Sequence, residues 1–217
     1  MLKVNGVTVR TGEITILRSL TLEVPPGAIV GLVGRNGAGK TTTLKSIMGL
    51  VPVASGQVRL DGVDLLPLPP HHRARLGIGY MPEDRRLIGP LTVQENILLP
   101  TWALGQEVPE ERLKAVYTLL PEVRELAPRR ASQLSGGQQK LVALARSLLV
   151  ARKLLLLDEP LEGIAPALAT RLAGVIRAFL GQEKDFSVLV AESDLARVRL
   201  FTESIYTIER GEVIQEE

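Results

Sequence analysis

The chain has 217 residues, of which 45% are hydrophobic and 3% aromatic, enough apolar material for the core of one compact domain. Its formal net charge of +2 is too small to indicate a nucleic-acid-binding protein, and the pairs Arg85-Arg86 and Arg129-Arg130 are expected to be solvated or to face a partner protein. The absence of cysteine fits a reducing cytoplasm, and without a signal peptide or an apolar run of ~18 residues the chain is predicted to have no membrane span.

The N-terminal quarter of the chain predicts antiparallel strands. Residues 2–9 and 20–24 alternate apolar and polar side chains, and Asn5-Gly6 is typical of a hairpin turn. Residues 58–60, directly before Asp61-Gly62, predict a strand of a second hairpin. These segments indicate an antiparallel edge beside the core of the domain.

A glycine-rich loop follows the first buried strand. Residues 28–33 form an apolar run, residues 34–41 match the phosphate-loop pattern G-x-x-x-x-G-K-[ST], and the apolar side chains of 42–50 have helical spacing. The helix N-terminus offers free N–H groups, and glycine lets the backbone approach a phosphate closely. We assign Lys40 to the β- and γ-phosphates and the Thr41 hydroxyl to Mg²⁺. The nucleotide-binding residues predicted in this segment are Gly34, Arg35, Asn36, Gly37, Ala38, Gly39, Lys40, Thr41 and Thr42.

A second helix start that contains glycine lies at residues 134–138. Ser135 suits an N-cap, and the apolar residues from 141 to 149 have helical spacing. A serine and two glycines at a helix start form another anion-binding nest. Because one ATP does not need two such nests from one chain, we expect this nest to cap the γ-phosphate of an ATP held by a second chain. Its residues are Ser135, Gly136, Gly137 and Gln138.

Two carboxylates end a later aliphatic run. Residues 154–157 are all leucine, as expected of a parallel strand buried on both faces, and Asp158 and Glu159 follow. A P-loop nucleotidase needs an acidic magnesium ligand at such a strand end. We therefore predict that Asp158 holds Mg²⁺ and that Glu159 orients or deprotonates the attacking water. A helix over 168–179, a strand over 187–191 and a last hairpin over 205–214 complete an α/β pattern.

The segments 34–41, 134–138 and 154–159, in that order and spacing, resemble an ATP-binding-cassette (ABC) ATPase over essentially the whole chain. The resemblance implies one P-loop NTPase domain over residues 1–217, of the α/β class, with a mainly parallel core sheet and an antiparallel β edge. It places a core lobe at 1–84 and 151–217 and a helical lobe at about 85–150. It also implies ATP and Mg²⁺ as cofactors, two ATPs between two ATPase chains, and hydrolysis coupled to transport.

The segment around Glu83 narrows this resemblance. Most relatives carry glutamine at Glu83, whereas Pro82-Glu83-Asp84-Arg85-Arg86 is similar to the ATPase subunits of branched-chain amino-acid importers, as is the loop 162–166. A carboxylate at Glu83 can still ligate Mg²⁺ through a hard oxygen. We therefore expect a cytoplasmic ATPase, peripheral on the inner face of the cell membrane. With permease subunits it drives uptake of branched-chain amino acids or a similar small polar solute. Urea or short-amide importers and lipid or lipopolysaccharide exporters are the alternatives.

Two further positions depart from the family's pattern. Relatives stack an aromatic ring on adenine from the position of Thr11, and most place a histidine that reaches the γ-phosphate at Ser193. Threonine cannot stack, which leaves the guanidinium of Arg10 as a substitute plane and predicts weak adenine discrimination. Ser193, a candidate catalytic residue, keeps a hydroxyl but is shorter and cannot become cationic. Because Thr11, Glu83 and Ser193 fall in one composite site, we expect an asymmetric heterodimer in which this chain's ATP turns over slowly.

Residues 85–102 are expected to border the groove that receives the membrane subunit. Other classes of function fit less well. Chromosome and DNA-repair ATPases separate their two halves with coiled coils, and no heptad run lies between residues 41 and 134. A non-catalytic binding module would not need the set of Lys40, Asp158 and Glu159. The apolar residues expected to form the docking patch are Leu87, Pro90, Leu91 and Trp102.

Overall fold

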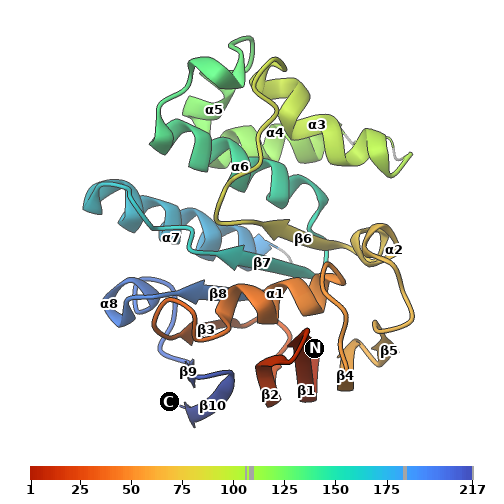
Figure 1. The fold of residues 1–217 in the computed structure, drawn as a ribbon. Helices are drawn as coiled ribbons and strands as arrows, with labels where there is room; N and C mark the ends of the chain where they lie inside the picture. Colours follow the sequence, from red (N-terminus) through yellow and green to blue (C-terminus); the bar gives the residue numbers. More distant parts are fainter. Residues whose placement is uncertain (106, 108–109, 183–184, 217) are drawn as a thin grey trace.

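A computed structural model describes residues 1–105, 107, 110–182 and 185–216, and its strands form two sheets (Figure 1). The first sheet consists of β1 (Leu2–Thr11), β2 (Ile14–Val24), β4 (Ser55–Leu60) and β5 (Val63–Asp64). They pair in the order β2-β1-β4-β5, and every pair is antiparallel. The predicted antiparallel edge is therefore a sheet of its own.

The second sheet has six strands and carries the core. They are β3 (Ile29–Val33), β6 (Ile78–Met81), β7 (Leu154–Asp158), β8 (Ser187–Glu192), β9 (Ile205–Glu209) and β10 (Glu212–Glu216). The order is β10-β9-β3-β8-β7-β6, and every neighbouring pair is parallel except β9 and β10. The predicted α/β class with a mainly parallel core sheet is confirmed.

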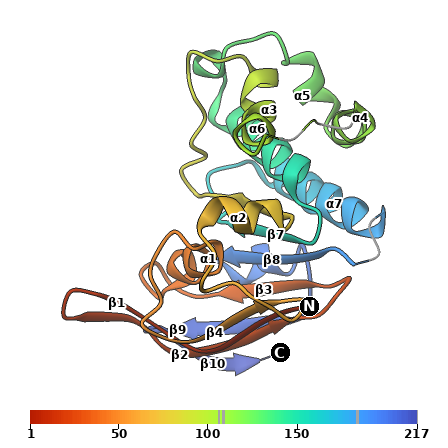
Figure 2. The same ribbon diagram turned by 90° about the vertical axis from the view of Figure 1, so that its right-hand side faces the viewer.

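The helices fall into two groups. Those interspersed with the strands are α1 (Lys40–Met48), α2 (Pro70–Arg75), α7 (Pro166–Gln182) and α8 (Leu195–Val198). The others follow one another along the chain: α3 (Val93–Ala103), α4 (Glu110–Leu119), α5 (Pro121–Glu125), η1 (Ala131–Gln133) and α6 (Gly136–Val150). Figure 2 shows this second group gathered at the end of the molecule away from β1, β2 and β4. Among the described residues of this stretch, the strand-type pairing is a single bridge, between Thr92 and Arg130.

Strand β7 shows why the leucine run is buried on both faces. Successive side chains of a strand point to opposite faces of its sheet. Leu154 and Leu156 enter the cluster that includes α1, between the two sheets, whereas Leu155 and Leu157 enter the cluster formed with helices α3 to α7. Both faces of this mainly parallel sheet are covered. Charged residues can therefore follow the leucines only where the strand ends, at the edge of the sheet.

The predicted hairpin turn at Asn5-Gly6 is wrong. Both residues lie inside β1. Between the paired positions at Val4 and Val7, β1 has three residue steps, whereas its partner strand β2 has only two. Gly6 has φ 58° and absorbs the extra residue as a bulge, a conformation that glycine takes without strain. The turn between β1 and β2 lies instead at Gly12-Glu13, because the apolar alternation continues past the bulge to Val9.

A buried arginine closes the C-terminal end of α6. The guanidinium of Arg112, on α4, donates to the carbonyls of Leu149 (2.9 Å), Leu148 (3.1 Å) and Ala151. The last turn of a helix leaves such carbonyls without partners in the helix, and a cation at that end also matches the helix dipole. Arg112 thereby fastens α4 to α6, which helical spacing alone could not reveal.

Candidate nucleotide site

Three strand ends meet at one edge of the six-stranded sheet. Val33 of β3 pairs with Glu192 of β8, and Asp158 of β7 pairs with Ala191, so the carboxyl ends of the three strands lie side by side. The glycine-rich loop, Glu159 and Ser193 follow these three strands directly. In open α/β sheets, ligands bind outside the carboxyl ends of the strands.

The loop between β3 and α1 has the geometry of an anion cradle. Gly37 and Gly39 have φ values of 82° and 115°, which residues with a side chain rarely adopt. Gly39 is the N-cap of α1 and provides no side-chain cap, so the first N–H groups of the helix are left for a ligand. Thr41 and Thr42 lie in the first turn of this helix.

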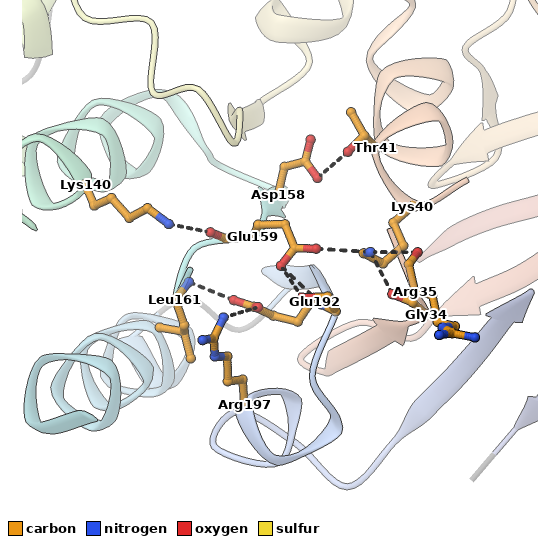
Figure 3. Close-up of polar contacts among 11 residues, drawn as sticks. Gly34, Arg35, Lys40, Thr41, Lys140, Asp158, Glu159, Leu161, Glu192 and Arg197 are labelled. Atoms are coloured by element: carbon orange, nitrogen blue, oxygen red, sulfur yellow. Dashed lines mark hydrogen bonds and ion pairs between the residues drawn. The ribbon is translucent and has the colours of Figure 1, made fainter. Parts of the chain in front are cut away.

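Lys40 connects the loop to the acidic strand end. Its ammonium, on a residue only 5% exposed, donates to the carbonyls of Gly34 (2.7 Å) and Arg35 (3.3 Å). The same ammonium forms an ion pair with Glu159 Oε1 at 3.0 Å (Figure 3). The fold therefore brings together two residues that are 119 positions apart in the sequence.

Asp158 is held between two hydroxyl groups. Thr41 donates to its Oδ1 at 2.9 Å and Tyr80, on β6, to its Oδ2 at 3.1 Å. Burial raises the pKa of Asp158 above its usual value, while the two hydrogen bonds act in the opposite direction. Thr41, Asp158 and the exposed Glu83 line one hollow of about 510 Å³. These are hard oxygen donors, so the residues present fit a divalent cation such as Mg²⁺. Sequence reasoning missed Tyr80, which no local motif marks.

Glu159 is fixed on both its backbone and its side chain. It has φ 48°, and its N–H donates to the carbonyl of Ala191 at 2.9 Å. Its Oε2 accepts hydrogen bonds from the backbone N–H and the hydroxyl of Ser193, at 3.1 and 3.2 Å. Burial alone would raise the pKa of Glu159, but the hydrogen bond with Glu192 and the bond and charge of Lys40 hold it below its usual value. Ser193, at the position where most relatives place a histidine that reaches the γ-phosphate, here contacts the carboxylate of Glu159.

Glu192 is a second buried carboxyl group that sequence reasoning missed. Its Oε1 accepts from the backbone N–H of Leu161 at 2.7 Å, and its Oε2 lies 3.9 Å from the guanidinium of Arg197. Burial, followed by the hydrogen bond with Glu159, raises the pKa of Glu192 to about 8. The sequence marks Glu192 only as an acidic residue that follows the apolar strand 187–191. An ordinary strand end with a solvated acid has the same pattern.

Glu192→Gln should change how stability depends on pH. Because its pKa rises from 4.5 to about 8 on folding, the folded protein keeps a proton that the unfolded chain releases between those pH values. Relative to the variant, the wild-type protein should therefore lose stability as pH rises from about 4.5 to about 8. Urea unfolding of both proteins across this range checks the prediction, and a constant difference between them would contradict it.

The Ser135–Gln138 segment lies apart from the phosphate loop of its own chain. It opens α6, which lies on the far side of β6 and β7 from α1 (Figure 1). Ser135 and Gln138 form a capping box: Ser135 Oγ accepts from the N–H of Gln138 at 3.3 Å, and Gln138 Oε1 accepts from the N–H of Ser135 at 2.9 Å. The sheet therefore separates this helix from α1, which carries Lys40 and Thr41.

The arginines of the Glu83 segment differ from the prediction in one case. Arg86, Arg129 and Arg130 are exposed, as expected. Arg85 is half-buried instead, and donates to Gln139 Oε1 of α6 at 3.1 Å. No local pattern marks this contact, because the two residues are 54 positions apart.

Neither Thr11 nor Arg10 lines the hollow beside Gly37 of the phosphate loop. A hollow of about 750 Å³ beside Gly37 of the phosphate loop is lined by Ile14 and Ile16 of β2, and Thr11 does not line it. Arg10 lines a different hollow. Two isoleucines, rather than Arg10, therefore border the space beside the phosphate loop.

This fold, with Lys40, Thr41, Asp158 and Glu159 at one sheet edge, defines a P-loop nucleotide-binding domain. Residues 17–162 match the family model described as ABC transporter. The chain is 34% identical to a probable branched-chain amino acid transport ATP-binding protein, LivF, of Archaeoglobus fulgidus, covering 93% of this chain and 85% of that one. It is 33% identical to BraG, a high-affinity branched-chain amino acid transport ATP-binding protein of Pseudomonas aeruginosa, covering 99% and 91%.

An exporter component and a solved cassette are similar too. The chain is 32% identical to the lipopolysaccharide export system ATP-binding protein LptB of Escherichia coli K12, covering 92% of this chain and 83% of that one. The dimeric ATP-binding cassette MJ0796, in a post-hydrolysis state bound to ADP and Pi, superposes with a TM-score of 0.87 at 28% identity, covering 100% and 98%. The chain belongs to the ABC transporter family, as an ATP-binding and ATP-hydrolysing subunit. None of the helices in its described residues is long and apolar enough to cross a membrane.

Proposed function

We propose that the chain powers the uptake of branched-chain amino acids, or of a similar small polar solute, as the ATPase subunit of an importer. The observation that carries this choice of solute is the Glu83 segment together with the similarity to LivF and BraG. The specific alternative is an exporter subunit, which the comparable similarity to LptB favours. In either case the chain works at the inner face of the membrane, with permease subunits supplying the path.

The same chemistry serves both alternatives. Water attacks the γ-phosphate in line, and catalysis comes from positioning and charge neutralisation. Lys40 and the first N–H groups of α1 bind the phosphates. Thr41, Asp158 and Glu83 would hold Mg²⁺, which when bound would neutralise phosphate charge. Ser193 donates to Glu159 and keeps its carboxylate in place.

Glu159 is the proposed general base. Its carboxylate lies 3.0 Å from Lys40 Nζ, so a phosphate group that draws Lys40 toward itself competes with the carboxylate for the same ammonium. The carboxylate is then free to orient a water and accept its proton. Binding of ATP and release of the base thus belong to one rearrangement of the Lys40 side chain.

A working site needs a second ATPase chain. Ser135, Gly136, Gly137 and Gln138 are proposed to cap the γ-phosphate of the partner chain's ATP, which their distance from this chain's own phosphate loop supports. The solved cassette MJ0796 is dimeric, which agrees with this arrangement. Because Thr11, Glu83 and Ser193 all depart from the family's pattern, the proposed partner is a different ATPase.

The hollow of about 510 Å³ is the proposed seat of the permease. Besides the proposed magnesium ligands, the residues that line this hollow include Leu50, Leu99, Pro100 and Ala103. Of the predicted docking residues, Trp102 is 53% exposed next to Ala103, whereas Leu87 packs against the core. Because one hollow contains both this apolar part and Asp158, a permease segment bound there would lie close to the magnesium ligands.

Reconstituted transport distinguishes the candidates. The chain would be placed with its permease subunits and partner ATPase in proteoliposomes, and ATP-dependent accumulation of labelled leucine and of labelled urea would be measured. Leucine accumulation that is lost with Glu159→Gln is the expected result. Urea accumulation without leucine, or release of lipid or lipopolysaccharide from the vesicles without solute uptake, would overturn the proposed solute.

A further inference from the structure

A buried lysine joins the start of α6 to the backbone of Glu159. Lys140 lies two residues after the Ser135–Gln138 segment and is 1% exposed. Its ammonium donates to the carbonyl oxygen of Glu159 at 2.8 Å (Figure 3). Moving an ammonium out of water costs several kcal/mol unless it is paired and hydrogen-bonded, so this contact holds the lysine in one place.

The surroundings of Lys140 are acidic. Burial lowers the pKa of Lys140, and the charges of Glu192, Glu162 and Glu159 act against that effect. Glutamates at the ends of β7 and β8 and in the loop after β7 thus attract the ammonium. An uncharged side chain of equal length could fill the space but could not hold these groups together.

The peptide that Lys140 holds is in an uncommon conformation. Glu159 has φ 48°, a region that is strained for a residue with a side chain and persists only where neighbours enforce it. The N–H of Glu159 is bound by Ala191 of β8, and its carbonyl by Lys140 of α6. The direction of the Glu159 side chain therefore depends on two elements, one in the core sheet and one in the helical group.

We propose that Lys140 is a positioning residue that couples the Ser135–Gln138 helix start to the Glu159 of the same chain. This rests on the proposed function, in which that helix start binds the partner chain's ATP and Glu159 serves this chain's own. When the partner's γ-phosphate draws the start of α6 toward it, Lys140 carries the carbonyl of Glu159 with it. Capture of one ATP then sets the geometry of the base at the other.

The test compares Lys140→Met, which keeps the length and removes the charge, with Lys140→Arg and with a matched control. Arg112→Met is that control, because it removes a buried cation that also donates to backbone carbonyls, but at the opposite end of α6. Mg·ATP hydrolysis is measured with the partner ATPase present. Lys140→Met should lower kcat about tenfold or more with KM for ATP within about twofold, because misplaced catalytic groups affect the chemical step more than binding. Lys140→Arg should restore most of kcat, and Arg112→Met should lower the Tm while leaving kcat near the wild-type value.

A second measurement does not depend on turnover. Amide hydrogen exchange of residues 159–162 in the nucleotide-free protein should be faster in Lys140→Met than in the wild type, and unchanged in Arg112→Met. Unchanged exchange in Lys140→Met, an unchanged kcat, or an equal loss of kcat in Arg112→Met would overturn the proposal. If the wild type shows no turnover even with the partner ATPase present, the proposed function fails, and the exchange experiment alone decides the role of Lys140.

Discussion

Glu159→Gln should lower the kcat of Mg·ATP hydrolysis by about 100-fold or more while ATP binding is retained. Glutamine cannot accept the proton of the attacking water, and removal of a general base commonly costs 10²–10⁴-fold. In the wild type Lys40 and Ser193 bind different carboxylate oxygens, and the single amide oxygen of glutamine can still accept from one of them, so the side chain should stay in the site. Steady-state hydrolysis with the partner ATPase present and binding of a fluorescent ATP analogue measure the two effects separately.

Glu162→Gln provides the control for this variant. It makes the same chemical change three residues further on, at a side chain that is exposed. It should leave both kcat and ATP affinity near the wild-type values. Hydrolysis by Glu159→Gln above about a tenth of the wild-type rate would mean that another group takes the proton.

The wild-type chain measured alone tests the proposed partner. Brisk hydrolysis without a second kind of ATPase would show that two copies of this chain build working sites, and the heterodimer proposal would fall. ATP binding without hydrolysis is the result that proposal expects.

Lys40→Met should abolish measurable ATP binding and lower the free energy of unfolding by about 3 kcal/mol. The Glu159 carboxylate is 7% exposed and would lose the ammonium at 3.0 Å, leaving a buried charge held only by Ser193 and the neighbouring carboxyl group. Removing one member of a buried ion pair costs more than the pair itself contributes, because the remaining charge stays desolvated. Urea unfolding of the nucleotide-free protein measures the stability change.

The double variant Lys40→Met/Glu159→Gln separates the two consequences. It has no unpaired carboxylate at position 159 and should recover most of the lost stability, but it should not regain ATP binding, because the phosphates still lack the ammonium. A double variant as unstable as Lys40→Met alone would show that the ion pair does not account for the loss.

The sequence predicted those motifs whose chemistry depends on residues that are neighbours in the chain. The glycine-rich loop 34–41 and the leucine run before Asp158 each contain the strand, turn or helix start that their function requires. Their elements appear in the structure within a few residues of the predicted bounds. The Asn5-Gly6 prediction failed for the converse reason, since the same dipeptide suits a tight turn and a bulge, and only the pairing of β1 with β2 selects between them.

The sequence by itself determined the class of protein, the phosphate loop and the acidic residues, because periodic burial and short motifs act over a few neighbouring residues. Only the tertiary structure decided what surrounds those residues. Tyr80 on Asp158, Glu192 and Ser193 on Glu159, and Lys140 on the Glu159 carbonyl all come from other elements. Their contacts span 19 to 78 positions of sequence, and no local pattern records them. They exist because parallel strands bring their carboxyl ends to one edge, and because a buried charge must find its partner wherever the fold places one.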